Sequence, residues 1–130
     1  MGGRMPVGVV DYEREYDNRG RVPEHPAIIE GWYDAAAAAR RTLGGEPDRA
    51  YGEHPRERFD LFRPTSARDG AAVLFVHGGY WQALEKAAFS HLANGPIAHG
   101  LPVAVAGYPL CPEVPLARIV ESLRAAVRAT

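Results

Sequence analysis

The chain has 130 residues, of which 46% are hydrophobic and 24% charged, and its formal net charge is −1. This composition is typical of a soluble globular protein and argues against a disordered or membrane-spanning chain. The 15 basic and 16 acidic side chains alternate along the chain, which argues against nucleic acid as a partner, because phosphate binding needs a clustered basic face.

The length fits one domain. Cys111 is the one cysteine of the chain, so neither an intramolecular disulfide nor a zinc knuckle can form. The apolar run Val7 to Val10 is interrupted and too short for the core of a signal peptide. We therefore expect a protein of the reducing cytoplasm.

Residues 1–23 are charged and aromatic, with a turn at Asn18-Arg19-Gly20, and predict an N-terminal arm that packs on the domain. The remainder, 24–130, has the patterns of an α/β core. From Pro26 to Gly44, apolar residues recur at three- and four-residue steps and predict an amphipathic helix. The residues of its expected inner face are Ile29, Trp32, Tyr33, Ala36, Ala39 and Leu43.

Two kinds of strand are expected next. Residues 58–63 partly alternate and end before Pro64, and they could pair with a short run at 50–51 as a small antiparallel pair. Residues 71–76 are uncharged and continuous, which predicts a central parallel strand buried on both faces. The pattern at 102–107 is similar and predicts a second such strand.

Helices are expected around these strands. Residues 85–99 suggest one that Gly95-Pro96 must kink or split. Pro115 opens the last helix, whose expected inner face is Leu116, Ile119, Val120, Leu123 and Val127. Strands that alternate with helices predict a parallel sheet with flanking helices and right-handed crossovers.

The most informative segment is His77-Gly78-Gly79-Tyr80-Trp81, at the carboxyl end of the first buried strand. Ligands gather at that edge of open α/β sheets. Two adjacent glycines allow positive φ angles and a close backbone approach, so that N–H groups can point toward a developing oxyanion. The alternative is that the glycine pair is only a turn.

These residues resemble the HGG-type oxyanion loop of the α/β-hydrolase esterases. Further matches are similar to the kynurenine formamidase (arylformamidase) branch, and they comprise Tyr80-Trp81, Leu84-x-Lys86, Phe89-Ser90 and Tyr108 to Glu113. The similarity covers most of the chain and is strongest from 74 to 113.

The resemblance implies an incomplete α/β-hydrolase fold that holds the first strands. It implies that the backbone N–H groups of Gly79 and Tyr80 form the oxyanion hole, while His77 and Gly78 shape the loop. Tyr80 and Trp81 would line a pocket for an aryl amide or ester. No cofactor is implied.

A nucleophile is missing from the chain. The hydrolase mechanism places its serine in G-x-S-x-G, and Ser66, Ser90 and Ser122 all lack that context. Cys111 has no base nearby and is followed by proline. The histidines show no metal-ligand spacing, and no metal is predicted; they are His25, His54, His91 and His99.

In the family pattern the last helix leads into a fifth strand that carries the nucleophile. The chain is therefore expected to end before the triad and to be inactive alone. The strand at 71–76 would then be a bare edge, which predicts self-association or pairing with a complementing C-terminal half. Three hypotheses follow: the N-terminal segment of a hydrolase, with N-formylkynurenine-type aryl formamides favoured; an inactive small-molecule binding module; or a truncated remnant.

Overall fold

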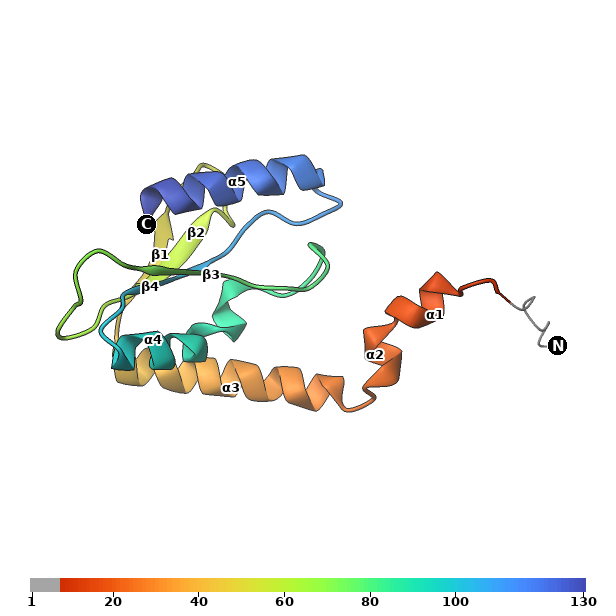
Figure 1. Cartoon of the computed structure of the whole chain (residues 1–130), viewed down its shortest axis with the longest axis horizontal. Helices are drawn as coiled ribbons and strands as arrows, with labels where there is room; N and C mark the ends of the chain where they lie inside the picture. The colour runs from red at the N-terminus through yellow and green to blue at the C-terminus, as the bar shows by residue number, and fades with distance from the viewer. Residues whose placement is uncertain (1–7) are drawn as a thin grey trace.

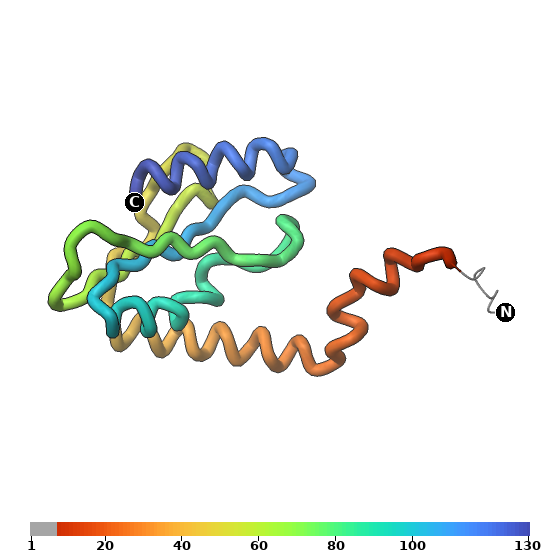
Figure 2. Tube along the Cα trace, viewed as in Figure 1, coloured from red at the N-terminus to blue at the C-terminus, as the bar shows by residue number. Residues whose placement is uncertain are grey.

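The computed structural model describes residues 8–130, which contain one four-stranded sheet (Figures 1 and 2). Its strands are β1 (Glu46–Ala50), β2 (Arg58–Phe62), β3 (Val73–Val76) and β4 (Val103–Ala106), in the spatial order β1-β2-β4-β3. β2 is antiparallel to both β1 and β4, whereas β3 and β4 are parallel. The predicted antiparallel pair is thus part of the same sheet, with β1 beginning earlier than expected.

Helices lie on both faces of this sheet. They are α1 (Tyr12–Tyr16), α2 (Asn18–Arg21), α3 (His25–Leu43), α4 (Asn94–Ala98) and α5 (Leu116–Ala129), with two 3₁₀ turns, η1 (Lys86–Ala88) and η2 (Ser90–Ala93). In Figures 1 and 2, α3 and α4 lie below the sheet and α5 lies above it. The α/β class with flanking helices agrees with the prediction.

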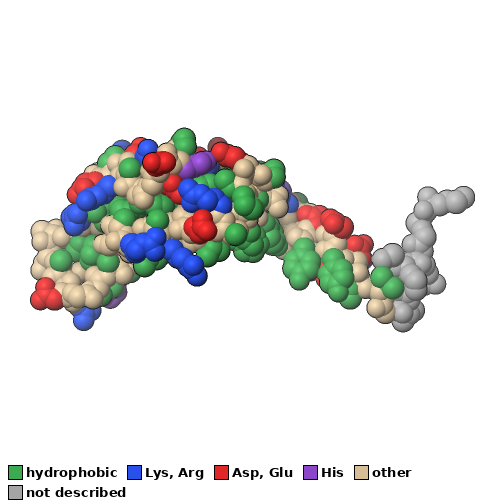
Figure 3. Space-filling model, turned by 90° about the horizontal axis from the view of Figure 1, so that it is seen from above, with side chains coloured by type: hydrophobic (Ala, Val, Ile, Leu, Met, Phe, Trp, Pro, Cys, Tyr) green, Lys and Arg blue, Asp and Glu red, His purple; other side chains and the backbone are tan. Residues whose placement is uncertain are grey.

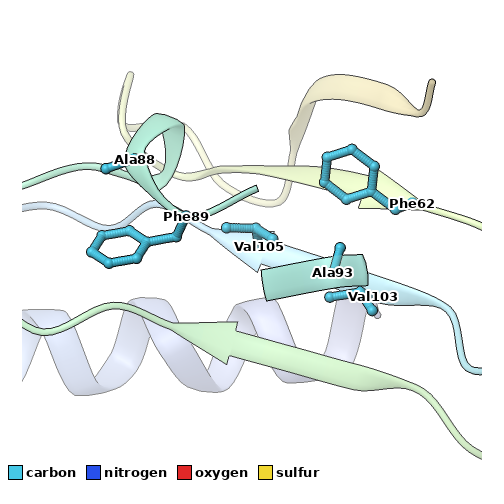
Figure 4. Packing of buried hydrophobic residues seen from close by; sticks show 6 residues of the cluster. All are labelled: Phe62, Ala88, Phe89, Ala93, Val103 and Val105. Atoms are coloured by element: carbon cyan, nitrogen blue, oxygen red, sulfur yellow. The ribbon is translucent and has the colours of Figure 1, made fainter. Parts of the chain in front are cut away.

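Strand side chains alternate between the two helical layers, as the period of two requires. Toward α3, the core cluster contains Phe62, Ala88, Phe89, Ala93, Val103 and Val105 (Figure 4). A second cluster is formed by Phe59, Leu61, Ala104 and Ala106. β4 lies between β2 and β3 and is buried along its whole length.

The helix α3 agrees with the pattern that predicted it. Ala36 and Ala39 are buried, and the other four residues of the expected inner face are half-buried. Gly44, with φ +67°, follows the last helical residue, and its N–H donates to the carbonyl of Arg40. A residue in this left-handed region commonly ends a helix.

The expectation for β3 was wrong in one respect. β3 lies at one edge of the sheet. Its first three residues are half-buried, and Val76 is 39% exposed. Its uncharged run predicted burial on both faces, but only β4 pairs with it within residues 8–130. The expectation of a bare edge describes it correctly.

The expected helix 85–99 was also wrong, since two 3₁₀ turns precede a short α4. Gly95 and Pro96 do not split α4, because proline in a first helical turn lacks only an N–H that would have no intrahelical partner.

The face that α5 turns to the sheet only partly matches the predicted one, in which Ile119 is buried and Leu123 half-buried. Ile119, Ser122 and Ala126 are buried, whereas Leu116, Val120 and Val127 are 45%, 46% and 63% exposed. The reason is the carboxylate of Glu57, only 3% exposed, which accepts a hydrogen bond from Ser122 and forms an ion pair with Arg118. A buried carboxylate must be paired, and this requirement orients the helix.

The N-terminal arm extends beyond the first turn of α3, away from the sheet (Figure 1). Its residues from 8 to 23 are exposed. The expectation that the arm packs on the domain was therefore wrong, apart from the hydrogen bond between Asn18 and Tyr80. The predicted turn at 18–20 is the helical turn α2, whose N-cap Asp17 accepts the N–H of Gly20. The first seven residues of the predicted arm lie outside the described residues.

Candidate functional site

The loop that follows β3 begins with a buried histidine. His77 is 3% exposed and stacks on Tyr108 and Phe89, with ring centroids 4.5 and 5.5 Å away. Its Nδ1 lies 2.7 Å from the carbonyl oxygen of Gly78. Because a carbonyl can only accept, Nδ1 carries the proton of the neutral ring.

Burial lowers the pKa of His77 below the usual 6.5, and the positive charge of Arg56 lowers it further, despite the opposing hydrogen bond to Gly78. The ring is therefore neutral near pH 7. Its Nε2 is buried without a hydrogen-bond partner among residues 8–130. The side chain thus fixes the start of the loop through stacking and one local hydrogen bond.

Glycine is required at 79 for two reasons. The residue has φ +122°, and a Cβ atom there would lie 2.4 Å from the carbonyl oxygen of Ala83. The N–H groups of Gln82 and Ala83 both donate to the Gly79 carbonyl at 3.1 Å. Tyr80 and Trp81 then adopt φ +51° and +57°, an unfavourable region for non-glycine residues that the surrounding contacts must hold.

This arrangement leaves backbone donors free. Within residues 8–130, the N–H groups of Gly78, Gly79, Tyr80 and Trp81 donate no hydrogen bond, whereas the two that follow are used inside the loop. Unpaired N–H groups in a tight loop can bind an anionic oxygen. Figure 1 shows that the loop and the N-terminal arm lie toward the same end of the molecule.

The loop is anchored at its far end by contacts that the sequence analysis did not predict, one of which involves Arg56. The N–H of Cys111 donates to the Trp81 carbonyl at 2.8 Å. Arg56 donates from Nη2 to Leu84 and from Nε to Tyr108, both carbonyl acceptors at 2.8 Å. One guanidinium therefore joins this loop to the segment after β4. Such a contact has no sequence pattern, because its acceptors are backbone atoms.

A groove opens beside the loop, with Gly79 and Tyr80 on one side and Trp32 of α3 on another. Tyr80 is 53% exposed, and its hydroxyl accepts a 2.8 Å hydrogen bond from the side-chain amide of Asn18. Trp81 is 50% exposed but does not line this groove. The structure thus places both predicted aromatic residues in the same loop, but only Tyr80 lies at the groove.

Several known proteins are similar to most of this chain. No protein-family model matches the chain. Kynurenine formamidase of Danio rerio is 31% identical over 104 residues, which are 79% of this chain and 34% of that protein. Kynurenine formamidase of Salmo salar is 29% identical over 107 residues, 82% of this chain and 35% of that protein.

Among solved structures, a candidate thioesterase from a Silicibacter species is 36% identical. It superposes with a TM-score of 0.83 over 89% of this chain and 45% of its own. The chain resembles the N-terminal part of an α/β-hydrolase of the kynurenine formamidase and esterase kind. Esterase B of Lactobacillus rhamnosis, 22% identical, shares the fold with a TM-score of 0.61, over 84% of this chain and 37% of its own.

This α/β-hydrolase-like chain spans about a third of the length of the curated relatives that it matches. Two of its three serines are buried in structural contacts: Ser90 accepts a hydrogen bond from Arg40, and Ser122 lies between Arg118 and Glu57. Ser66 is exposed in the loop before β3.

Metal-ligand clusters and membrane-spanning helices are both absent from the part of the chain from 8 to 130. No three His, Cys, Asp or Glu side chains gather there as a metal site would require. No helix in this range is long and apolar enough to cross a membrane. On the face shown in Figure 3, basic, acidic and apolar side chains are interspersed over the body of the hydrolase-like domain.

Proposed function

We propose that this chain supplies the oxyanion hole of a serine hydrolase that acts on a formamide or a carboxylic ester. Aryl formamides such as N-formylkynurenine are the favoured substrates. The names of the kynurenine formamidase relatives support this class, and the esterase neighbours support the fold. The catalytic serine, its acid and its histidine come from polypeptide outside these 130 residues, and the chain alone is inactive.

The observation that carries the proposal is the pair of free N–H groups at Gly79 and Tyr80, held at the carboxyl end of β3. In the reaction, the substrate carbonyl oxygen becomes negative as the nucleophile attacks. Both N–H groups then donate to it, and the hydrogen bond from His77 to the backbone carbonyl of Gly78 keeps the loop in shape. One such donor typically contributes about 2.7–4 kcal/mol to transition-state stabilisation. Tyr80, which lines the groove beside the loop, contacts the aromatic part of the substrate.

The first test is the intact mass of the native protein from its source, together with the nucleotide sequence that follows codon 130. A product of roughly twice this length or more, with G-x-S-x-G, supports the proposal. In that product, replacing Tyr80 by its α-hydroxy acid converts the N–H into an ester oxygen and keeps the phenol. We expect kcat to fall about 10²- to 10³-fold.

The matched control is Tyr80→Phe, which keeps the N–H and loses the hydroxyl, and which should change kcat far less. Equal rates for the ester-containing and native enzymes would contradict the oxyanion role. Absence of hydrolysis of any aryl formamide or ester by the longer product would contradict the enzyme class.

A second candidate function is an inactive small-molecule binding module, favoured by the groove beside Tyr80. It predicts a native product of 130 residues that binds an aromatic ligand and hydrolyses nothing. A truncated remnant instead predicts neither binding nor a stable product. The single cysteine fits a reducing compartment, and we propose the cytoplasm as the location.

The proposal also includes a partner for β3. Its outer side carries N–H and C=O groups that no strand within residues 8–130 pairs, and exposed edges of this kind pair with other chains. The partner is a second copy of the chain or the complementing C-terminal half of the hydrolase.

A further inference from the structure

The groove beside the loop has walls of different chemistry. It is an open cleft of about 700 Å³ between the N-terminal arm, α3 and the loop after β3. Ile29 and Trp32 form its apolar side, and Tyr80 closes it near the free N–H groups. The arm contributes Asn18 and Arg19. Apolar walls with a few polar groups are usual in small-molecule sites.

The arm is tied to the loop by one defined contact. The side-chain amide of Asn18 donates to the hydroxyl of Tyr80 at 2.8 Å, across 62 residues of sequence. α2 begins at this asparagine, so the bond places the next residue, Arg19, at the groove. Asp17 lies there too, but one of its carboxylate oxygens caps α2 by accepting the N–H of Gly20 at 2.8 Å.

The arginines of the arm differ in their partners. Arg14 and Arg21 both form ion pairs with Glu15, at 3.3 and 2.6 Å. Arg19 forms no ion pair within residues 8–130 and lines the groove instead. A guanidinium that is free beside an aromatic wall is suited to the planar carboxylate of a ligand that also carries an aromatic ring.

We infer that the groove binds the aryl part of a substrate that also carries a carboxylate, and that Arg19 recognises this carboxylate. The inference rests on the proposed function and assigns to the arm a part in specificity. Trp32 contacts the ring, Asn18 holds the arm in position through Tyr80, and the scissile carbonyl lies toward the N–H groups of the loop. Ligands without the negative charge bind more weakly.

The experiment uses the full 130-residue chain and two probes of the same shape, 3-phenylpropionate and 3-phenylpropionamide. Trp32 and Trp81 are the two tryptophans of the chain, so a Trp81→Phe background leaves the groove tryptophan as the fluorescent reporter. We expect the anion to bind about three- to fivefold more tightly than the amide, as expected for one exposed ion pair. Arg19→Gln should abolish the difference.

Arg14→Gln is the matched control, because it removes the same charge from the same arm, away from the groove, and it should leave the preference unchanged. Three results would overturn the inference. They are equal affinities of the two probes for the chain that keeps Arg19, a preference for the anion that survives Arg19→Gln, and no binding of either probe. If a longer product hydrolyses aryl amides but does not prefer anionic substrates, the role of Arg19 in the groove is contradicted and the proposed function is not. An intact preference without hydrolysis would contradict the proposed function alone.

Discussion

The hydroxyl of Tyr108 donates a 2.6 Å hydrogen bond to the carbonyl oxygen of His77. Tyr108 lies two residues beyond the end of β4, and His77 lies one residue beyond the end of β3. Tyr108 is 1% exposed. This bond joins the carboxyl ends of the two parallel strands where the loop begins. It satisfies a buried carbonyl that lies beyond the sheet's own hydrogen bonds.

Replacing Tyr108 by phenylalanine should therefore lower the free energy of unfolding by about 1–3 kcal/mol, the usual cost of leaving a buried polar group unpaired. Urea denaturation monitored by circular dichroism measures this free energy of unfolding. Tyr12→Phe is the control, since Tyr12 is 66% exposed, and it should change stability by less than about 0.5 kcal/mol. Equal stabilities of the two variants would show that the buried bond contributes nothing.

The two adjacent glycines should respond differently to alanine. Gly79→Ala forces a Cβ atom against the Ala83 carbonyl at a φ of +122°, which should cost about 1–3 kcal/mol and reshape the loop. A Cβ at Gly78 meets no atom within 4 Å, so Gly78→Ala should be nearly neutral. Amide hydrogen exchange at Cys111, which donates to the Trp81 carbonyl, reports on the loop. Equal exchange in both variants would be evidence against this account.

Stability should depend on pH through His77. Burial lowers its pKa in the folded chain below 6.5, so the unfolded chain binds a proton first as the pH falls. The contribution of the neutral ring is fully present above the unfolded pKa and is lost below it. The free energy of unfolding should therefore fall below about pH 6.5, by up to about 1.4 kcal/mol per pH unit.

His77→Asn should remove this contribution, so the difference between the two proteins should itself vary with pH between about 5 and 7.5. Urea midpoints at half-unit steps of pH measure it, and the NMR titration of the His77 ring gives the pKa directly. Parallel pH profiles of the two proteins would contradict the prediction.

The edge of β3 should make the chain self-associate when no other partner is present. Sedimentation velocity should show species larger than the monomer as the concentration rises. Val76→Lys places a charge on this edge, where Val76 is 39% exposed, and should return the chain to monomer. Val120→Lys changes a similarly exposed apolar residue on α5 and serves as the control. If it disrupts association instead, α5 is the interface.

Regular patterns predicted the local structure well. The three- and four-residue steps gave the inner face of α3, and the uncharged run at 102–107 gave the buried strand β4. The prediction of the inner face of α5 partly failed because a polar contact outweighs the apolar pattern of this helix. The orientation of α5 depends on the carboxylate of Glu57, which precedes the first residue of that helix by 59 positions.

The candidate site was predicted in the same uneven way. The loop from His77 to Trp81 carries its own signal, because adjacent glycines directly after a buried strand indicate a tight turn or a close backbone approach. Asn18 and Arg56 carry none, since their partners are a distant hydroxyl and two backbone carbonyls. Contacts of this kind depend on the arrangement of segments in space and not on neighbouring residues.

The position of β4 has a consequence for how the domain assembles during synthesis. β4 pairs with β2 on one side and with β3 on the other, yet it is the last strand of the four to leave the ribosome. Until then the β1–β2 hairpin and β3 have no common partner, and their apolar faces stay open. The nascent chain is therefore expected to need protection from aggregation until β4 emerges.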